Sequence, residues 1–326
     1  MKGAMPMNRR LVLGLLAGLC LAHAAVAQYP ARPIRWIVPY TPAGITDTVT
    51  RIVAQKLEGA LGQPVVIENK PGANSIVGAE AVARSAPDGY MGLTVIAAHA
   101  ANATLYAGKL AFDPVKSFAP VALVGVAPLI LTVNNDFPAR DVKELVEYAR
   151  ANPGKVSFGS SGVGSAAHLT TELLKQTANI DMVHIAYKGT APALTALLAG
   201  DIQVLVDVPS SMLPQVRAGK VRALGLFAAK RIAGAPEVPT VAEAGGPAIE
   251  GSTWVMFLVP AGTPREIVAR LSTETARVLA APELRARLEQ LGVEPVGSTP
   301  AEAARFLDDE IAKWARVITT AKVKAE

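Results

Sequence analysis

Two patterns of apolar residues alternate along this chain: short continuous runs, and positions that repeat every three to four residues. The run at residues 34–38 predicts a strand, and the apolar positions between Val49 and Leu61 have helical spacing. Further strands are predicted at residues 65–68, 93–96, 129–133, 156–158, 202–206, 221–227 and 254–259. Strands that alternate with helical segments are typical of βαβ units, so the pattern predicts an α/β fold with mostly parallel sheets.

The pattern changes after the last of these runs. Three helical patterns follow it, and they start near Pro264, Pro282 and Pro300. Proline is tolerated in the first turn of a helix, because its missing N–H would have no intrahelical partner there. The chain is therefore expected to end in a helical segment.

The first residues have the layout of an export signal. Basic residues at Lys2, Arg9 and Arg10 precede an apolar run at 11–21, and small residues at 25–27 follow at the spacing of a signal-peptidase site. The apolar run is too short for a bilayer of about 30 Å, which takes roughly 20 residues, so a permanent anchor is disfavoured. We expect a Sec-type signal peptide over residues 1–27, with cleavage after Ala27.

Composition narrows the classes of protein further. At roughly 150 residues per domain, 326 residues leave room for two domains. The net charge is +5, and three of these positive charges would leave with the signal, which argues against a nucleic-acid surface. The only cysteine, Cys20, lies inside the predicted signal. The mature chain would therefore have no disulfide, no cysteine nucleophile and no thiolate metal site.

A turn rich in glycine and serine, residues 159–165, is the first candidate site. It lacks the Gly-x-Ser-x-Gly spacing of a nucleophile elbow, because the fifth position from Gly159 is Val163. It also lacks the complete dinucleotide fingerprint, because Gly162-x-Gly164 is followed by Ala167. Serine hydroxyls and free N–H groups before a helix can bind a carboxylate. The turn therefore predicts an anion site, and the alternative is a tight turn with nothing bound.

Two aspartates and one lysine stand near predicted turns. Asp47 precedes a helical run and is expected to cap that helix rather than touch a ligand. Asp207 ends a β run, where it is better placed to face a cleft. Lys188 lies in the turn at 187–190 and is taken as the only cation near these loops, either facing a ligand or simply solvated.

The three histidines outside the signal do not form a recognisable metal or catalytic pattern. His99, His168 and His184 have no carboxylate or second histidine at metal-ligand spacing. General acid–base catalysis would require a positioned pair that the sequence does not display. We therefore expect hydrogen-bonded structural histidines, no metal and no cofactor.

Taken together, the motifs resemble the periplasmic solute receptors of the tripartite tricarboxylate transporter family, the Bug receptors. The resembling segments are residues 29–34, 38–47, 68–73, 86–90, 118–121, 159–162 with 168–169, 184–189, 239–245 and 260–264. The resemblance implies a two-lobed periplasmic binding protein of the type II-like, Venus flytrap kind. It places lobe 1 at 28–126 plus 251–326, lobe 2 at 127–250, and the hinge near 127–133 and 254–259.

The resemblance also implies a function without a reaction. The protein would be a monomer that captures a small carboxylate (a dicarboxylate, an aromatic carboxylate or an amino acid) and delivers it to membrane transporter subunits. An extracytoplasmic sensor using the same pocket remains an alternative, and a secreted serine hydrolase a weaker one. The ligand-binding residues it implies are Thr41, Ala43, Gly44, Ile45, Thr46, Asp47, Ala98, His99, Ser160, Ser161, Gly162, Gly164, Ser165, Tyr187, Lys188 and Asp207.

One departure from the family pattern bears on the ligand. The first loop of these receptors usually carries two or three glycines, whereas here Ala43 and Ile45 flank the single Gly44. The added methyl and butyl groups could crowd backbone donors or provide an apolar wall. We therefore expect a more apolar or aromatic carboxylate rather than a small amino acid, with Gly44 and Ser161 as the residues nearest to it.

Overall fold

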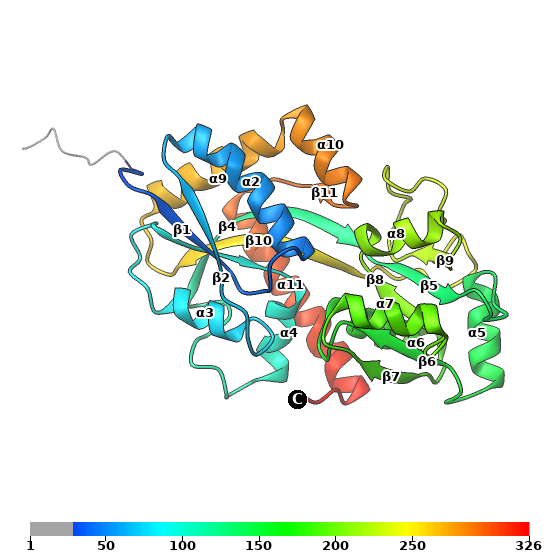
Figure 1. Ribbon diagram of the computed structural model, residues 1–326. Coiled ribbons are helices and arrows are strands. Elements are labelled where there is room, and N and C mark those ends of the chain that lie inside the picture. The colour runs from blue at the N-terminus through cyan, green and yellow to red at the C-terminus, as the bar shows by residue number, and fades with distance from the viewer. Residues whose placement is uncertain (1–28, 326) are drawn as a thin grey trace, which may run out of the picture.

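A computed structural model describes residues 29–325 of the protein, so the predicted signal peptide and its cleavage site lie outside the described residues. The chain forms two α/β lobes side by side (Figure 1). The strands of lobe 1 are β1 (Ile34–Val38), β2 (Val65–Asn69), β3 (Met91–Val95), β4 (Phe118–Pro128), β10 (Ser252–Pro260) and β11 (Glu294–Pro295). They form a six-stranded sheet in the order β11-β4-β10-β3-β1-β2.

Lobe 2 is built on a second, five-stranded sheet in the order β7-β6-β8-β5-β9. Its strands are β5 (Ile130–Asn134), β6 (Ser157–Ser160), β7 (Val183–Ala186), β8 (Val204–Asp207) and β9 (Val221–Leu226). Its helices are α5 (Val142–Ala151), α6 (Ala166–Ala178), α7 (Thr190–Ala199) and α8 (Pro209–Arg217). The helices of lobe 1 are α2 (Ile45–Leu61), α3 (Ile76–Ala83), α4 (Ala97–Leu105), α9 (Arg265–Leu279), α10 (Pro282–Gln290) and α11 (Pro300–Ala321).

Both sheets are mixed: in each, most strands share one direction and a few antiparallel strands are added, within the expected α/β fold class. In lobe 1, β1 runs parallel to β2 and β3, but β10 is antiparallel to both β3 and β4. In lobe 2, β6 is parallel to β7 and β8, whereas β5 is antiparallel to β8 and β9. The antiparallel pairing of β4 with β10 has a simple cause. The chain leaves lobe 1 along β4 and returns along β10, so these two strands must run in opposite directions.

Strands β4 and β10 connect the two lobes. They pair from Ser252↔Pro128 to Pro260↔Phe118, and Leu129 alone separates β4 from β5. Leu129 N–H donates to Gly251 O at 2.9 Å, and Phe227 N–H donates to Leu129 O at 2.9 Å, so the crossing point is hydrogen-bonded to the returning chain. The residue boundaries of the lobes and the hinge positions stay a prediction.

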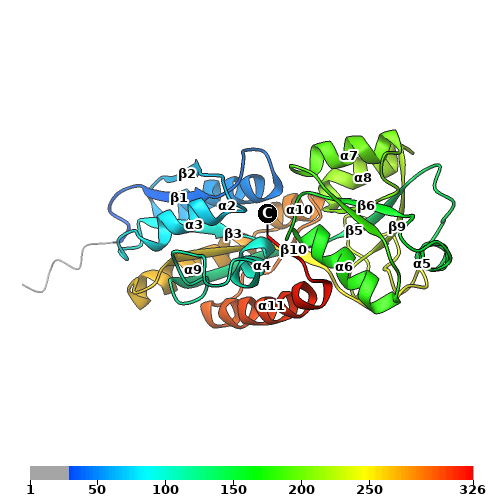
Figure 2. The ribbon, with the colours of Figure 1, turned by 90° about the horizontal axis from the view of Figure 1, so that it is seen from below.

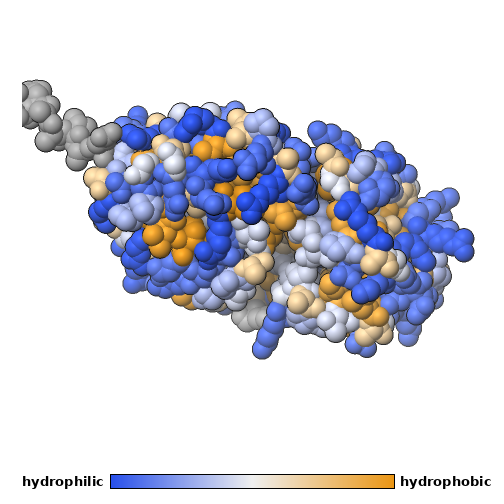
Figure 3. Space-filling model, turned by 45° about the horizontal axis from the view of Figure 1, so that its top comes forward, coloured by the Kyte–Doolittle hydropathy of each residue, from blue (hydrophilic) through white to orange (hydrophobic). Residues whose placement is uncertain are grey.

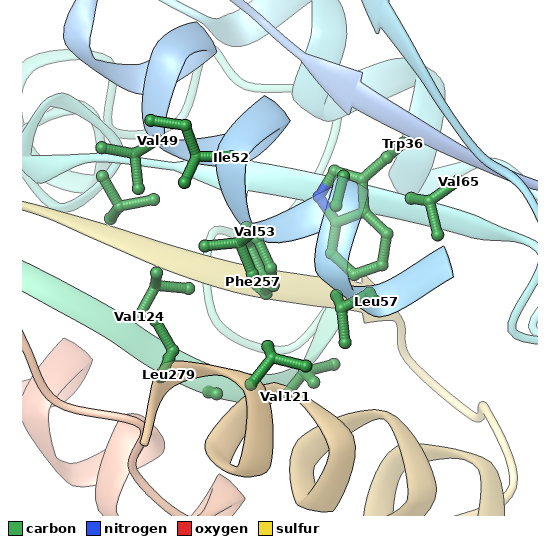
Figure 4. Close-up of a cluster of buried hydrophobic side chains, with 14 of the residues drawn as sticks. Trp36, Val49, Ile52, Val53, Leu57, Val65, Val121, Val124, Phe257 and Leu279 are labelled. Atoms are coloured by element: carbon green, nitrogen blue, oxygen red, sulfur yellow. The ribbon is translucent and has the colours of Figure 1, made fainter. Parts of the chain in front are cut away.

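The core of lobe 1 has a layer on each face of its sheet. On one face α2 and α9 pack against the sheet, and side chains including Trp36, Val53, Leu57 and Phe257 are buried together there (Figure 4). On the other face lies α11, the long red helix of Figure 2, whose Trp314 is fully buried with Trp254 of β10. Among the described residues, no helix combines the length and apolar character needed to cross a bilayer.

Candidate functional site

Helices begin directly after several strands of both sheets, on the side where each strand ends. In lobe 1, α2 and α4 follow β1 and β3, and in lobe 2, α6 and α8 follow β6 and β8. The loop before α2 lies on the side of lobe 1 that faces lobe 2 (Figure 1). The first N–H groups of a helix lack intrahelical partners and carry partial positive charge, so this arrangement favours an anion.

The two lobes meet beside the turn at residues 160–165. A Cβ on Gly164 would lie 2.4 Å from Leu105 Cδ1, at the end of α4, and 3.6 Å from Asn74 Nδ2. No side chain larger than hydrogen fits there without a shift, and the φ of Gly164, 76°, also favours glycine. The turn of lobe 2 is therefore packed directly on lobe 1. Figure 3 shows pale residues, of intermediate hydropathy, in the furrow between the lobes.

In lobe 1, Asp47 does not cap α2 as expected. The N-cap is Gly44, with no side-chain cap, and Asp47 is the third residue of the helix. Its carboxylate accepts hydrogen bonds from Ala43 N–H at 3.0 Å, Arg51 Nε at 3.0 Å and Asn69 Nδ2 at 2.8 Å. Burial alone would raise the pKa of Asp47, but these donors outweigh it and hold the pKa below its usual value. Asp47 thus fixes the loop before α2 while its own charge is compensated.

Arg51 shows that Lys188 is not the only cation near these loops. Its guanidinium binds Asp47 and also donates to Asn69 Oδ1 at 2.8 Å, and Asn69 in turn donates to Tyr40 O at 3.0 Å. The spacing from Asp47 to Arg51 is that of an i,i+4 pair, a signal the sequence carried. Lys188 itself is exposed.

In lobe 2, the turn at residues 160–165 is held from within. Ser160 is fully buried, and its Oγ lies 2.7 Å from His184 Nε2 and 3.1 Å from Gly162 O. Ser165 caps α6, because its Oγ accepts from His168 N–H at 3.2 Å. Ser161 is only partly buried. Of the serines in this turn, Ser161 rather than Ser160 can face a ligand.

A stacked histidine pair lies beneath this turn, and sequence reasoning missed it. The rings of His168 on α6 and His184 on β7 are 3.7 Å apart and inclined by 10°. Burial lowers the pKa of His168 to about 3 and that of His184 to about 4, with further lowering by Lys175 in both and by His184 in the case of His168. Both rings are neutral near pH 7. The two residues lie on different elements, far apart in sequence, so no local spacing could have predicted the pair.

Tyr187 and Asp207 also lie beside the turn of lobe 2 or at a neighbouring strand end. Tyr187 N–H donates to Ser160 O at 3.1 Å, and a Cβ on Gly162 would lie 3.6 Å from Tyr187 O. Asp207 accepts from Thr190 Oγ1 at 2.8 Å and from Val208 N–H at 2.7 Å. Burial raises the pKa of Asp207 to about 6, against the effect of these two donors.

Two of the expected ligand residues are engaged elsewhere. Ala98 is buried, and the buried ring of His99 packs edge-on against Phe118 and stacks on Phe112. His99 Nε2 lies 2.9 Å from Pro114 O. The side chain of His99 therefore belongs to the core of lobe 1 and does not lie on the rim of a cleft.

Two hollows in the described part of the chain lie away from the expected residues. One of about 310 Å³ is on lobe 2, beside Asn135 and Arg222. The other, of about 480 Å³, lies between residues 230–236 of lobe 2 and residues 285–295 of lobe 1. Both carry charged side chains at the surface, and neither is bordered by the starts of α2 or α6.

Two α/β lobes joined by crossing strands, with helix N-termini beside the furrow between them, define a two-lobed solute-binding protein. Residues 49–323 match the tripartite tricarboxylate transporter family receptor, and the chain belongs to this family. Protein BugT of Bordetella pertussis is 35% identical over 331 residues, covering 98% of this chain and all of BugT.

Two solved structures with a named ligand are similar over most of the chain. R. palustris Rpa4515 with adipate is 34% identical, with a TM-score of 0.83 and coverage of 91% of this chain and 99% of that one. MatC (Rpa3494) from Rhodopseudomonas palustris with bound malate is 34% identical, with a TM-score of 0.78 and coverage of 89% and 100%.

These similarities confirm the expected family, fold class and general function. The protein is a periplasmic solute-binding receptor that serves a membrane transporter, and it is not an enzyme. The hydrolase and sensor alternatives are not favoured. The geometry also argues against a serine hydrolase. Ser160 is buried, and no carboxylate among the described residues is hydrogen-bonded to His184.

Proposed function

We propose that this receptor captures a small carboxylate between the loop at residues 41–47 of lobe 1 and the turn at 160–165 of lobe 2. The observation that carries the proposal is the start of α2 in lobe 1 and of α6 in lobe 2, each directly after a strand, with the turn before α6 packed on lobe 1. The similar receptors with adipate and malate support the same ligand class. The captured ligand would then be presented to the membrane transporter.

In lobe 2, the start of α6 supplies neutral donors. The N–H groups of Ala166 and Ala167 belong to the first helical turn, where no intrahelical acceptor is available, and the hydroxyl of Ser161 is close in sequence. The Ser165 side chain satisfies only the N–H of His168. A carboxylate oxygen accepts such donors readily, because the helix end carries partial positive charge.

In lobe 1, the start of α2 offers the matching surface. Gly44 has no side-chain cap, so the first N–H groups of the helix stay available. Thr41, Ala43 and Gly44 are exposed, whereas Asp47 is already occupied by three donors. Arg51 is paired with Asp47, so the two side chains together have no net charge to attract a ligand. Recognition by backbone donors and hydroxyls therefore fits the site better than a salt bridge.

Ala43 and Ile45 are the residues from which we infer which kind of carboxylate the site prefers. Ile45 is half-buried and packs against the core of lobe 1, which leaves only part of its side chain for a ligand. A dicarboxylate or an aromatic carboxylate would use this apolar edge, whereas a small amino acid would not. We therefore propose a more apolar carboxylate as the ligand. We also propose that the protein is exported through a signal cleaved after Ala27 and that the receptor is a monomer.

Isothermal titration of the mature chain, residues 28–326, tests this function. The panel contains adipate, malate, benzoate and aspartate, and each acid is paired with the compound in which carboxamides replace its carboxylates. We expect at least one acid to bind with a dissociation constant near micromolar, about −8 kcal/mol, and its amide to bind at least about tenfold more weakly. Equal binding of acid and amide, or binding of none of the acids, would contradict the proposal.

A further inference from the structure

One backbone N–H of the turn at residues 160–165, called the ligand turn below, is hydrogen-bonded to a buried side chain. Gly164 N–H donates to His168 Nδ1 at 3.2 Å, and both residues are buried. Gly164 is also the residue at which the turn contacts Leu105 of lobe 1. The hydrogen bond therefore ties the interlobe contact point of the turn to the first turn of α6.

This bond requires one particular form of the imidazole. Nδ1 can accept only when it carries no proton, so the ring must be neutral with its proton on Nε2. The stacked ring of His184 lies 3.7 Å away, and a positive charge on His168 would be placed against it. The nearest charged groups on α6, Lys175 and Glu172, are paired at 2.8 Å, so the carboxylate is not free to stabilise an imidazolium.

His184 holds the other end of the turn. Its Nε2 lies 2.7 Å from Ser160 Oγ, and Ser160 Oγ in turn contacts Gly162 N–H at 3.2 Å and Gly162 O at 3.1 Å. Phe158 lies beside the pair, with its ring centroid 4.9 Å from that of His184 and 6.2 Å from that of His168. The two rings thus form one rigid layer, which touches the turn at Ser160 through His184 and at Gly164 through His168.

We propose that His168, stacked on His184, is a positioning residue for the ligand turn, and that it acts as a neutral Nδ1 acceptor for Gly164 N–H. The proposal rests on the proposed function, because it assigns to His168 the orientation of the donors that meet the carboxylate. With Gly164 N–H turned inward, the free N–H groups at the start of α6 keep their direction toward the furrow. His168 does not itself contact the ligand.

The first test reads the imidazole directly and requires no ligand. A two-bond ¹H–¹⁵N spectrum of the mature chain at pH 7 should show His168 neutral with Nε2 protonated and Nδ1 bare. A proton on Nδ1, or a charged ring, would overturn the proposal whatever the protein binds.

The second test compares three variants by titration with the tightest carboxylate of the panel. His168→Leu removes the acceptor, and we expect at least about fivefold weaker binding, the fold-change of one net hydrogen bond, together with faster amide exchange at Gly164. His168→Asn places an oxygen where Nδ1 lies and should recover most of the affinity. His99→Leu removes a buried histidine of lobe 1 outside the turn, so it controls for a general loss of stability.

The outcomes separate the two proposals. If the wild-type chain binds no carboxylate, the proposed function fails. The acceptor role of His168 is then tested by the spectrum alone. If the wild type binds and His168→Leu binds equally well, His168 positions nothing. If His168→Leu and His99→Leu weaken binding equally while His168→Asn rescues neither affinity nor Gly164 protection, the role of His168 is structural only and the proposal is overturned.

Discussion

Ala43 adopts a conformation that suits glycine better than alanine. Its φ is 68°, in the left-handed region, and it stands beside Gly44 in the loop that we assign to the ligand. For a residue with a Cβ this conformation costs about 1–2 kcal/mol. The hydrogen bond from Ala43 N–H to Asp47 at 3.0 Å helps to hold the loop in this shape. Strain of this kind is often found where a binding loop must be kept in one conformation.

We predict that Ala43→Gly stabilises the protein. Removal of the Cβ relieves the left-handed strain, and the greater freedom of glycine in the unfolded chain offsets part of the gain, so we expect about 0.5–1 kcal/mol in urea unfolding. Ala269→Gly, at an exposed position inside α9, is the matched control and should cost about 1 kcal/mol. If Ala43→Gly lowers the free energy of unfolding, the left-handed conformation of Ala43 does not strain the folded protein.

Single residues differed in how far the sequence could predict them. The turn at 159–165 was found from its glycines and serines, and Arg51 could have been found from its helical spacing to Asp47. The stacking of His168 on His184 could not be found, because it depends on how α6 and β7 pack. The burial of His99 was equally hidden, since it depends on Phe112 and Phe118 folding over it.

At the scale of elements, the C-terminal helix α11 is attached to the sheet by one buried carboxylate. Glu310 Oε2 accepts from both Trp254 Nε1 and Trp314 Nε1 at 2.8 Å, and Lys313 Nζ lies 3.1 Å from Oε1. Both tryptophans are fully buried. The carboxylate therefore satisfies two indole donors that would otherwise be without an acceptor in the core.

We predict that Glu310→Ala destabilises lobe 1 severely. Two buried indole N–H groups would lose their acceptor, which we expect to cost about 3 kcal/mol in urea unfolding. Glu310→Gln keeps one acceptor oxygen and should lose about half as much. Glu147→Ala, which removes an exposed i,i+4 pair with Lys143 on α5, should change stability by less than about 0.5 kcal/mol. Similar values for Glu147→Ala and Glu310→Ala would refute this role.

Most elements followed from apolar periodicity, and the exceptions have physical causes. The predicted strands and the three C-terminal helices are present with small shifts at their ends. The long strand β4 was missed, because Pro120 and Gly125 interrupt its apolar run. The strand β7 was missed because it is an edge strand with exposed Val183 and Ile185 and little periodicity. The antiparallel direction of β10 and β5 was not predicted, because the crossing of the chain between the lobes leaves no local signal.

At the scale of the whole molecule, buried titratable groups should make stability depend on pH. The pKa values of His99 and His184 are lowered to about 4 and that of His168 to about 3. The unfolded chain therefore takes up these protons near pH 6.5, before the folded protein does, and stability is lost as the pH falls. Asp207 acts in the opposite direction, because its pKa is raised to about 6 and the fold takes up that proton first.

We predict that the free energy of unfolding falls between pH 6.5 and pH 4. Three histidines against one aspartate leave about two protons of net uptake by the unfolded chain, at most roughly 2–3 kcal/mol per pH unit from these four groups. Urea unfolding across this range measures how steeply the free energy of unfolding depends on pH. The variant His99→Gln should reduce this dependence and leave the turn at residues 160–165 intact. A protein that is as stable at pH 4.5 as at pH 7 would contradict the burial of these rings.

The central claim is that one carboxylate is held by both lobes at once. Hydrogen–deuterium exchange of the mature chain, with and without the tightest acid found by titration, tests it most directly. We predict that the ligand slows exchange in residues 41–47 of lobe 1 and in residues 160–167 of lobe 2 together, because helix N-termini from both lobes donate to it. Protection confined to one lobe, or found instead around residues 230–236 and 285–295, would contradict the account.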